Sequence, residues 1–479
     1  MMRFIADLHI HSPYSRATSR KITINDLNRN GKLKGLNLIG TGDVTHTFWR
    51  NEMEKNLHFS KDYELYVSKK SLPEVNNQSV FFIPTTEVNC IFSKDDPDKA
   101  SKKKPKKKQL HHLIILPDLK TAEEVSKVLS KFGNMEVDGR ANLHISAAKL
   151  VEILTSISSS IIIIPAHIWT PWFSLFGAFS GFDSISECYE DQLKHIYALE
   201  TGLSSDPPMN WRLSQLDDFL LVSNSDAHSA NPWRLGREAN IFELEELSYE
   251  ALINALKKRS SVGKNKLSAT IEVYPDLGKY HYTGHRNCGV SLSPEEAQKI
   301  DNKCPVCGGY LTIGVMQRVE ELADRSQNNI SKNKPGFFST LPLHEILSKV
   351  YGIDTYYSKT LWKHYYEIVE KTGSEFNALI FTPEDVLDKI IRKNVFEMII
   401  ALRNNEIRLK PGFDGEYGKI IIGEKIDETP AFSLDQKQKQ KQKQKQKQKE
   451  KEQERIKISP YPQKESRKDK KTITLDEFL

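Results

Sequence analysis

Cysteine and long apolar runs are both scarce in this 479-residue sequence. The longest apolar run, around Ile161–Ile164, has the length of a strand, so no segment is long enough to cross a bilayer as a helix. The first residues, Met1–Phe4, show no apolar leader, and we expect a cytoplasmic protein with no membrane partner. The five cysteines include one closely spaced pair, which argues against a disulfide framework and favours metal binding in a reducing compartment.

The sequence also lacks an evenly distributed positive charge. Its net charge is +6, but the positive residues are concentrated in two segments. The segment Gln436–Lys471 holds 15 Lys/Arg and 5 Asp/Glu, and Lys102–Lys108 adds six lysines around one proline. The combined positive charge of these two segments exceeds the net charge of the whole chain, so the remaining residues carry a net negative charge. An acidic body suits a carboxylate-rich metal site, and the basic segments suit a polyanion. The alternative for the Lys102–Lys108 run is an ordinary solvated loop.

From Met1 to about Asn265, short Val/Ile/Leu-rich runs alternate with amphipathic stretches such as Thr121–Lys131 and Ala147–Ser156. Alternating strands and helices predict a parallel sheet, and this many repeats predict an α/β barrel. After Asp276 the sequence becomes loop-rich, and Leu341–Leu409 has the pattern of several helices. The strict Gln/Lys alternation of Gln436–Lys449 cannot bury a core and predicts a linker.

Metal-binding side chains accompany the predicted strands at widely separated positions. Residues two apart on a strand face the same side, so His9 and His11 can chelate one ion, and Asp226 and His228 repeat the spacing. Asp43, Glu87 and His167 also follow apolar runs. Polar caps at strand ends are the alternative, but this many coincidences favour one barrel mouth that holds divalent metals for phosphoester hydrolysis.

Two parts of this cluster stay open at the level of sequence. Only one of the adjacent His111 and His112 can face inward on a strand that runs into Leu113–Leu116. His46 follows Asp43 at a spacing that suits a supporting or phosphate-facing role as well as a ligand. Glu200 follows an apolar stretch and is a further candidate.

A second metal motif follows the barrel. His285-x2-Cys288, fifteen residues and then Cys304-x2-Cys307 have the spacing of a structural zinc site, and Gly308 and Gly309 allow the turn around the thiolates. His281 could replace His285. We expect this zinc to fix a small loop-rich module.

Aromatic and cationic residues near the predicted mouth are candidates for substrate binding. Trp169, Trp172 and Phe173 follow His167 and could stack on nucleotides or line a base pocket, or they could form a hydrophobic lid. Arg234 could bind phosphate or could be a surface ion-pair partner.

The ligand series His9-x-His11, Asp43, Glu87, a later His, His167 and Asp226-x-His228 resembles that of the PHP (polymerase and histidinol phosphatase) superfamily. Pro165–Phe173, Glu200–Asp206 and the zinc-like insert further resemble the endonuclease Q family, over roughly Met1 to Ile422. The resemblance implies a distorted (β/α)7 barrel with a trinuclear metal site. It also implies nicking of DNA on the 5′ side of deaminated bases and abasic sites.

Carried onto this sequence, the resemblance implies a catalytic cluster in which Glu87 bridges two metals and Glu87, Asp226 and His228 are catalytic. The ligands would be His9, His11, Asp43, Glu87, His112, His167, Asp226 and His228, holding Zn, Mg or Mn. The expected domains are a catalytic barrel (1–268), a zinc-binding module (269–333), a helical DNA-binding domain (334–425), a basic linker (426–471) and a tail (472–479).

The tail places Leu475, Phe478 and Leu479 in a pattern that resembles the sliding-clamp (PCNA) interaction peptide. Thr472 stands where the clamp peptide usually has Gln, and Leu479 stands where it usually has its last aromatic residue. A disordered tail with accidental apolar residues is therefore the alternative.

We therefore predict a metal-dependent endonuclease acting on single- or double-stranded DNA with a deaminated base (uracil, hypoxanthine, xanthine) or an abasic site. A PHP-type phosphomonoesterase acting on a small metabolite is the alternative enzyme. A non-catalytic DNA-binding factor is a third hypothesis, which the full ligand series disfavours.

Overall fold

The computed structural model describes residues 1–70, 80–94, 106–258, 262–326 and 334–421. All of them belong to one compact unit, Met1–Glu424. No helix within these ranges is both long and apolar enough to traverse a bilayer. The predicted linker and clamp-like tail, and most of the Lys102–Lys108 run, lie outside the described residues.

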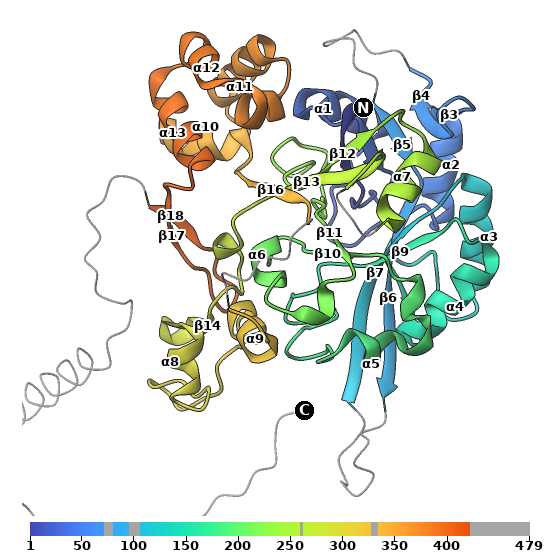
Figure 1. Cartoon of the computed structure of the whole chain (residues 1–479). Coiled ribbons are helices and arrows are strands. Elements are labelled where there is room, and N and C mark those ends of the chain that lie inside the picture. The colour runs from blue at the N-terminus through green and yellow to red at the C-terminus, as the bar shows by residue number, and fades with distance from the viewer. Residues whose placement is uncertain (71–79, 95–105, 259–261, 327–333, 422–479) are drawn as a thin grey trace, which may run out of the picture. The chain divides into compact units, whose positions relative to one another are not determined.

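Strands from an eight-stranded, a four-stranded and a two-stranded sheet together make up the barrel ring (Figure 1). In one arc, β1 (Met2–Asp7) pairs in parallel with β2 (Leu38–Gly40), and β2 pairs in parallel with β5 (Phe81–Ile83). After Pro84 the chain continues as β6 (Thr85–Lys94), which pairs with β7 (Lys106–Ile115), and β7 pairs with β9 (Ile162–Pro165). Next come β10 (Ala198–Glu200) and β11 (Leu220–Val222), a parallel pair. A bridge between Ile10 and Ala227 returns the ring to β1.

One strand of the ring runs against the predicted direction. β7 is antiparallel to both β6 and β9, so the all-parallel sheet predicted from the alternation is wrong at this strand. Because β7 is reversed, His111, which precedes its apolar half, still lies at the same mouth as residues that follow β2, β9 and β11. The expected α/β barrel is confirmed in its distorted form.

Helices cover the ring, and the two predicted amphipathic stretches, Thr121–Lys131 and Ala147–Ser156, correspond to the third and fourth of them. The helices are α1 (Ile24–Lys34), α2 (Thr47–Asn56), α3 (Leu119–Leu129), α4 (Ala147–Ile157), α5 (Ile185–Tyr189), α6 (Pro207–Asn210) and α7 (Tyr249–Lys257). The Asp118 and Ser146 side chains cap α3 and α4 by accepting hydrogen bonds from the amides of Thr121 and Lys149. The apolar faces of α3 and α4 share one core with β6 (Figure 1).

Further strands extend the β1 side of the ring on both edges. One edge adds β12 (Ala239–Leu244), β13 (Lys266–Glu272) and β16 (Gly336–Ser339), and the other adds the hairpin of β3 (Leu57–Ser60) and β4 (Leu65–Ser68). β8 (Ala141–Leu143) pairs in parallel with β6. The expected border at residue 268 falls inside β13, because this strand completes the barrel sheet before the chain leaves it.

A loop-rich module follows β13. It contains β14 (Thr283–His285), β15 (Val290–Leu292), α8 (Pro294–Gln298) and α9 (Val315–Leu322). Its small core is formed by Val290, Leu292, Ala297, Cys304 and Leu311. So few buried side chains give little stability, and a metal is a usual supplement in a module of this size.

The predicted helical region is confirmed beyond β16. It comprises α10 (Leu343–Tyr351), α11 (Lys359–Thr372), a π-helical turn (Asn377–Phe381), α12 (Glu384–Ile390) and α13 (Lys393–Arg403). A hairpin of β17 (Arg408–Lys410) and β18 (Lys419–Ile421) ends the described chain. A buried ion pair between Lys34 of α1 and Glu375, at 2.7 Å, joins this region to the barrel.

Candidate metal centre

Three side chains enter the barrel mouth from strained strand ends. Asp43, His167 and Asp226 follow β2, β9 and β11, and their φ angles are 46°, 31° and 45°. Residues with a side chain rarely adopt positive φ, so surrounding contacts must hold these conformations. The Ser12 amide donates to Asp43 Oδ2 at 2.6 Å, and the His167 amide donates to Glu200 Oε2 at 2.9 Å. The strain turns each side chain into the mouth.

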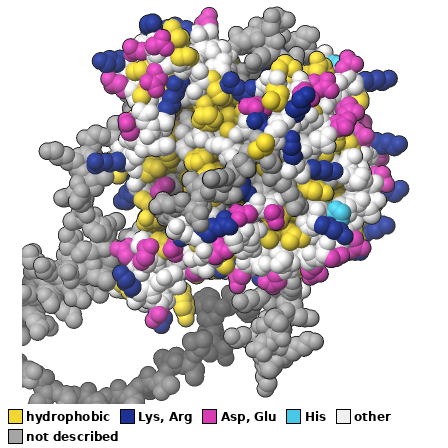
Figure 2. All heavy atoms as spheres, in the orientation of Figure 1, with side chains coloured by type: hydrophobic (Ala, Val, Ile, Leu, Met, Phe, Trp, Pro, Cys, Tyr) yellow, Lys and Arg dark blue, Asp and Glu magenta, His cyan; other side chains and the backbone are white. Residues whose placement is uncertain are grey.

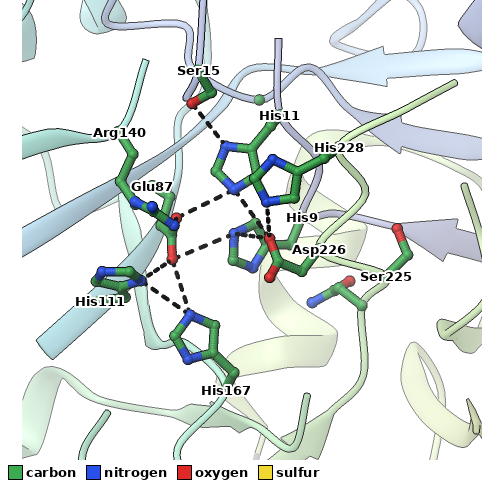
Figure 3. Close-up of polar contacts among 12 residues, drawn as sticks. His9, His11, Ser15, Glu87, His111, Arg140, His167, Ser225, Asp226 and His228 are labelled. Atoms are coloured by element: carbon green, nitrogen blue, oxygen red, sulfur yellow. Dashed lines mark hydrogen bonds and ion pairs between the residues drawn. The ribbon is translucent and has the colours of Figure 1, made fainter. Parts of the chain in front are cut away.

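His9, His11 and Asp226 form the first ligand group (Figure 3). His11 Nε2 lies 3.0 Å from Asp226 Oδ1, and His9 Nε2 lies 3.9 Å from the same oxygen. A carboxylate lies behind each ring, with Glu200 Oε1 3.0 Å from His9 Nδ1 and Asp43 Oδ1 3.1 Å from His11 Nδ1. Such carboxylate–histidine pairs fix the tautomer and direct Nε2 at a metal.

Glu87, His111 and His167 form the second group. Glu87 Oε1 lies 2.8 Å from His111 Nδ1 and 3.2 Å from His167 Nε2. Its other oxygen, Oε2, lies 3.3 Å from His11 Nε2, which belongs to the first group. Figure 3 shows Glu87 between the two groups. This position is the one that a carboxylate bridging two ions requires.

Mutual electrostatics set the charges of the cluster. Burial disfavours the imidazolium of His9, yet Glu200 and Glu87 raise the pKa of His9 well above its usual value. Burial would raise the pKa of Glu87, but its neighbours His111 and Arg140 hold that pKa well below its usual range, and of the two Arg140 carries the permanent charge. Burial lowers the pKa of His111 to about 4 against the opposing effect of Glu87. A proton on His9 therefore balances the nearby carboxylates, a task that divalent cations can take over.

The donor set fits divalent metal ions. His9 Nε2 is buried and has no hydrogen-bond partner among the described residues, although it faces Glu87 and Asp226. A buried nitrogen left without a partner is costly, and a cation would satisfy it. Imidazole and carboxylate together suit Zn²⁺ or Mn²⁺, and the carboxylates also suit Mg²⁺.

The prediction for His112 is wrong, and His111 takes its place. Alternation along β7 turns His112 to the outer face, where its Nε2 lies 2.8 Å from Tyr189 Oη. Burial lowers the pKa of His112 to about 3.

Asp43 and His228 lie beside the two groups, and their predicted ligand roles stay predictions. Asp43 contacts the Nδ1 side of His11. His228 stacks on His11 at 4.4 Å, and its Nδ1 lies 2.7 Å from Thr18 Oγ1. His46 stacks on Tyr14 at 4.5 Å and belongs to neither group, and its role stays open.

The substrate candidates separate into buried and exposed side chains. Trp169 is fully buried and donates from Nε1 to Asn210 Oδ1 at 2.7 Å, so its prediction as a stacking surface is wrong. Trp172 and Phe173 are 39% and 41% exposed, and the Phe173 ring lies 5.2 Å from that of His111. Arg234 is half-buried, and its charge acts on the buried carboxyl of Glu345 in the helical region.

Sequence reasoning missed Arg140, whose Nη1 lies 3.2 Å from Glu87 Oε2. It stands just before β8, in a loop without apolar periodicity, so no pattern in the sequence marks it. Glu200, noted only as a further candidate, is fully buried behind His9.

The predicted zinc ligands meet in the small module. One atom from each of His285, Cys288, Cys304 and Cys307 lies within 4.8 Å of the others. Burial would raise the pKa of Cys304, but the amides of Cys307 and Val306 lower it to about 6, which favours a thiolate. His281 lies apart, 3.6 Å from Asp276, so it does not replace His285.

Comparisons with known proteins agree with this geometry. The crystal structure of the lesion-specific endonuclease PfuEndoQ from Pyrococcus furiosus matches with a TM-score of 0.75 and 35% identity, over 91% of this chain and 99% of that one. The chain belongs to the endonuclease Q family. A structure of Endonuclease Q with a 27-mer duplex carrying an abasic lesion matches at a TM-score of 0.74, with 35% identity over 90% of this chain and all of that one. Membership in this family classes the chain as an endonuclease, a hydrolase of phosphodiester bonds.

Relatives of this endonuclease Q family member include two uncharacterised proteins. MJ0043 of Methanocaldococcus jannaschii is 39% identical over 255 residues, which is 53% of this chain and 31% of that protein. YqxK of Bacillus subtilis is 29% identical over 317 residues, which is 65% of this chain and 73% of that protein. Residues 342–406 match the family described as the MJ0043 C-terminal domain, and this match spans the helices α10 to α13.

Proposed function

We propose that this chain hydrolyses the DNA phosphodiester on the 5′ side of a deaminated base (uracil, hypoxanthine or xanthine) or an abasic site. One observation carries the proposal. Two ligand groups, linked by the contact between Glu87 of one and His11 of the other, lie at the mouth of a barrel in a chain that matches a lesion-specific endonuclease over almost its whole length. Divalent cations bound there would activate water and neutralise phosphate charge.

Each part of the site has a task in this reaction. His9, His11 and Asp226 would hold one ion, and His111 and His167 would hold a second that shares Glu87. Glu200 and Asp43 orient the two histidines of the first group. The exposed rings of Trp172 and Phe173, beside His111, offer an apolar wall for an extruded base or its neighbours.

The remaining modules support a macromolecular substrate. The His285/Cys288/Cys304/Cys307 cluster would hold a structural zinc, and the helical domain would contact the duplex. A small phosphomonoester requires neither of them. The tail 472–479, which lies outside the described residues, would present a clamp-binding (PCNA) peptide on its basic linker.

A nicking assay tests the proposal. End-labelled duplexes with one uracil, hypoxanthine or abasic site are incubated with Mg²⁺, Mn²⁺ or Zn²⁺ and with EDTA. We expect a metal-dependent nick immediately 5′ of the lesion. Intact lesion duplexes together with turnover of a generic phosphomonoester would replace the proposal with the phosphatase alternative.

Asp226→Asn is the matching variant. It removes a charged oxygen from the first group, and we expect cleavage to fall at least about 100-fold while the duplex still binds. Asp218→Asn, the same change at an exposed position, is the control and should cleave normally. Unchanged cleavage by Asp226→Asn would remove this residue from the metal centre.

A further inference from the structure

Arg140 brings a permanent positive charge into a cluster otherwise composed of carboxylates and imidazoles (Figure 3). Within the described ranges, Glu87 is the partner that the structure records for its guanidinium, through Nη1 and Oε2 at 3.2 Å. The side chain is 27% exposed, whereas Glu87 beneath it is fully buried. One edge of the guanidinium therefore contacts the centre, while part of the Arg140 side chain stays accessible.

Hydrogen bonds to Asp138 and a close backbone approach at Gly139 hold the loop that carries Arg140 in place. Asp138 Oδ1 accepts hydrogen bonds from the Arg140 amide at 3.1 Å and from Ser15 Oγ at 3.3 Å. A Cβ added at Gly139 would lie 2.4 Å from Asp43 Oδ2, so only glycine lets the loop approach so closely. The guanidinium is thus held against the metal ligands by a fixed turn and not by a solvated surface loop.

A guanidinium presents several N–H donors in a planar fork that matches two oxygens of a phosphate. A phosphodiester carries one negative charge, and it gains a second when deprotonated water bonds to phosphorus before the ester oxygen leaves. A fixed cation beside that phosphorus stabilises the later state more than the earlier one, which is the requirement for catalysis.

We propose that Arg140 binds the non-bridging oxygens of the scissile phosphate and stabilises the charge that develops on them. This inference rests on the proposed function, because it assigns a catalytic residue to the same site. The competing explanation is that Arg140 only balances the charge of Glu87, in which case its loss would alter metal binding first.

The test compares Arg140→Gln, Arg140→Lys and the control Arg16→Gln, which removes an exposed guanidinium from a neighbouring loop. Four quantities are measured: bound metal, affinity for an uncut lesion duplex in EDTA, single-turnover nicking rate, and affinity of the metal-loaded protein for inorganic phosphate. For Arg140→Gln we expect a nicking rate about 100-fold lower and phosphate binding about 10-fold weaker, with metal content unchanged. The nicking rate and phosphate affinity of Arg140→Lys should lie between those of Arg140→Gln and those of the unsubstituted protein. Arg16→Gln should match the unsubstituted protein in both quantities.

Two results would overturn the inference. One is unchanged nicking and phosphate binding in Arg140→Gln. The other is a loss of bound metal whose replacement at high concentration restores the full rate, which would leave Arg140 as a charge partner of Glu87. If the unsubstituted protein nicks no lesion duplex, the proposed substrate is wrong, and the phosphate affinities still decide the role of Arg140.

Discussion

At the scale of single residues, the metal centre depends on side chains that the backbone turns in unusual directions. Asp43, His167 and Asp226 all have positive φ, and each directly follows a strand or its short extension. The adjacent His111 and His112 show the same dependence on backbone direction. His111 faces Glu87, while His112 faces Tyr189 on the other side of β7.

This difference gives a paired prediction. His111→Gln removes a nitrogen 2.8 Å from Glu87 Oε1, and we expect less than the full content of divalent metal and at least about 100-fold slower nicking. His112→Gln loses only the hydrogen bond to Tyr189, so metal content and nicking should persist while stability falls by about 1 kcal/mol. Metal analysis and nicking rates of both variants provide the measurement. The reverse pattern would restore His112 as the ligand.

At the scale of elements, the loop that follows Asp226 and His228 is anchored to the helical region. Trp233, at its far end, is buried and lies 5.0 Å from His344 on α10, while Trp362 on α11 packs 4.6 Å from the same imidazole. His344 is fully buried, and neither of its ring nitrogens has a hydrogen-bond partner among the described residues. Lys34, whose Nζ donates to the Pro232 carbonyl at 2.9 Å, lies in the same junction. The helices thus fix a loop that carries predicted metal ligands.

This junction should make stability depend on pH. Burial, assisted by the charge of Lys34, lowers the pKa of His344 to about 3, whereas the unfolded chain titrates near 6.5. The unfolded state therefore binds a proton that the folded state refuses, and stability is lost as pH falls below about 6.5. His344→Phe removes this loss. The unfolding free energy of the variant minus that of the unsubstituted protein should therefore be about 2 kcal/mol larger at pH 5 than at pH 7.

Denaturant unfolding of both proteins at several pH values measures the difference. His195→Phe, at a histidine outside the helical junction, is a control that should follow the unsubstituted protein more closely. An advantage of His344→Phe that is the same at pH 5 and pH 7 would contradict the assignment.

At the scale of the whole molecule, the small module that carries the predicted zinc ligands contacts both the barrel and the hairpin of β17 and β18. Arg318 of α9 donates from Nε to the Phe176 carbonyl at 3.1 Å, and Glu320 pairs with Arg212 at 2.5 Å. The Tyr282 amide donates to the Gly412 carbonyl, which ties the module to the turn between β17 and β18. A change in the cysteine cluster should therefore reach beyond the module.

Replacement of both Cys304 and Cys307 by Ser tests this. We expect loss of bound zinc, a midpoint of thermal unfolding lower by about 5 °C, and weaker duplex binding. Cys90→Ala removes a buried core thiol outside the cluster and should leave zinc content unchanged. Unaltered zinc, stability and duplex affinity in the double variant would show that the cluster is not a zinc site.

Charge at this scale is mixed on the face that Figure 2 presents, where Lys and Arg side chains are interspersed with Asp and Glu. The Lys and Arg side chains visible on that face form no large patch of one sign.

The sequence by itself determined the residue types of the metal centre, the alternation of strands and helices, and the spacing of the cysteine cluster. Each follows from local periodicity or from short ligand spacing. Only the tertiary structure decided that β7 runs backwards, that His111 enters the mouth, that Trp169 is buried and that Arg140 contacts Glu87. These properties depend on strand pairing and side-chain direction between segments far apart in the chain, and local pattern carries no information about either.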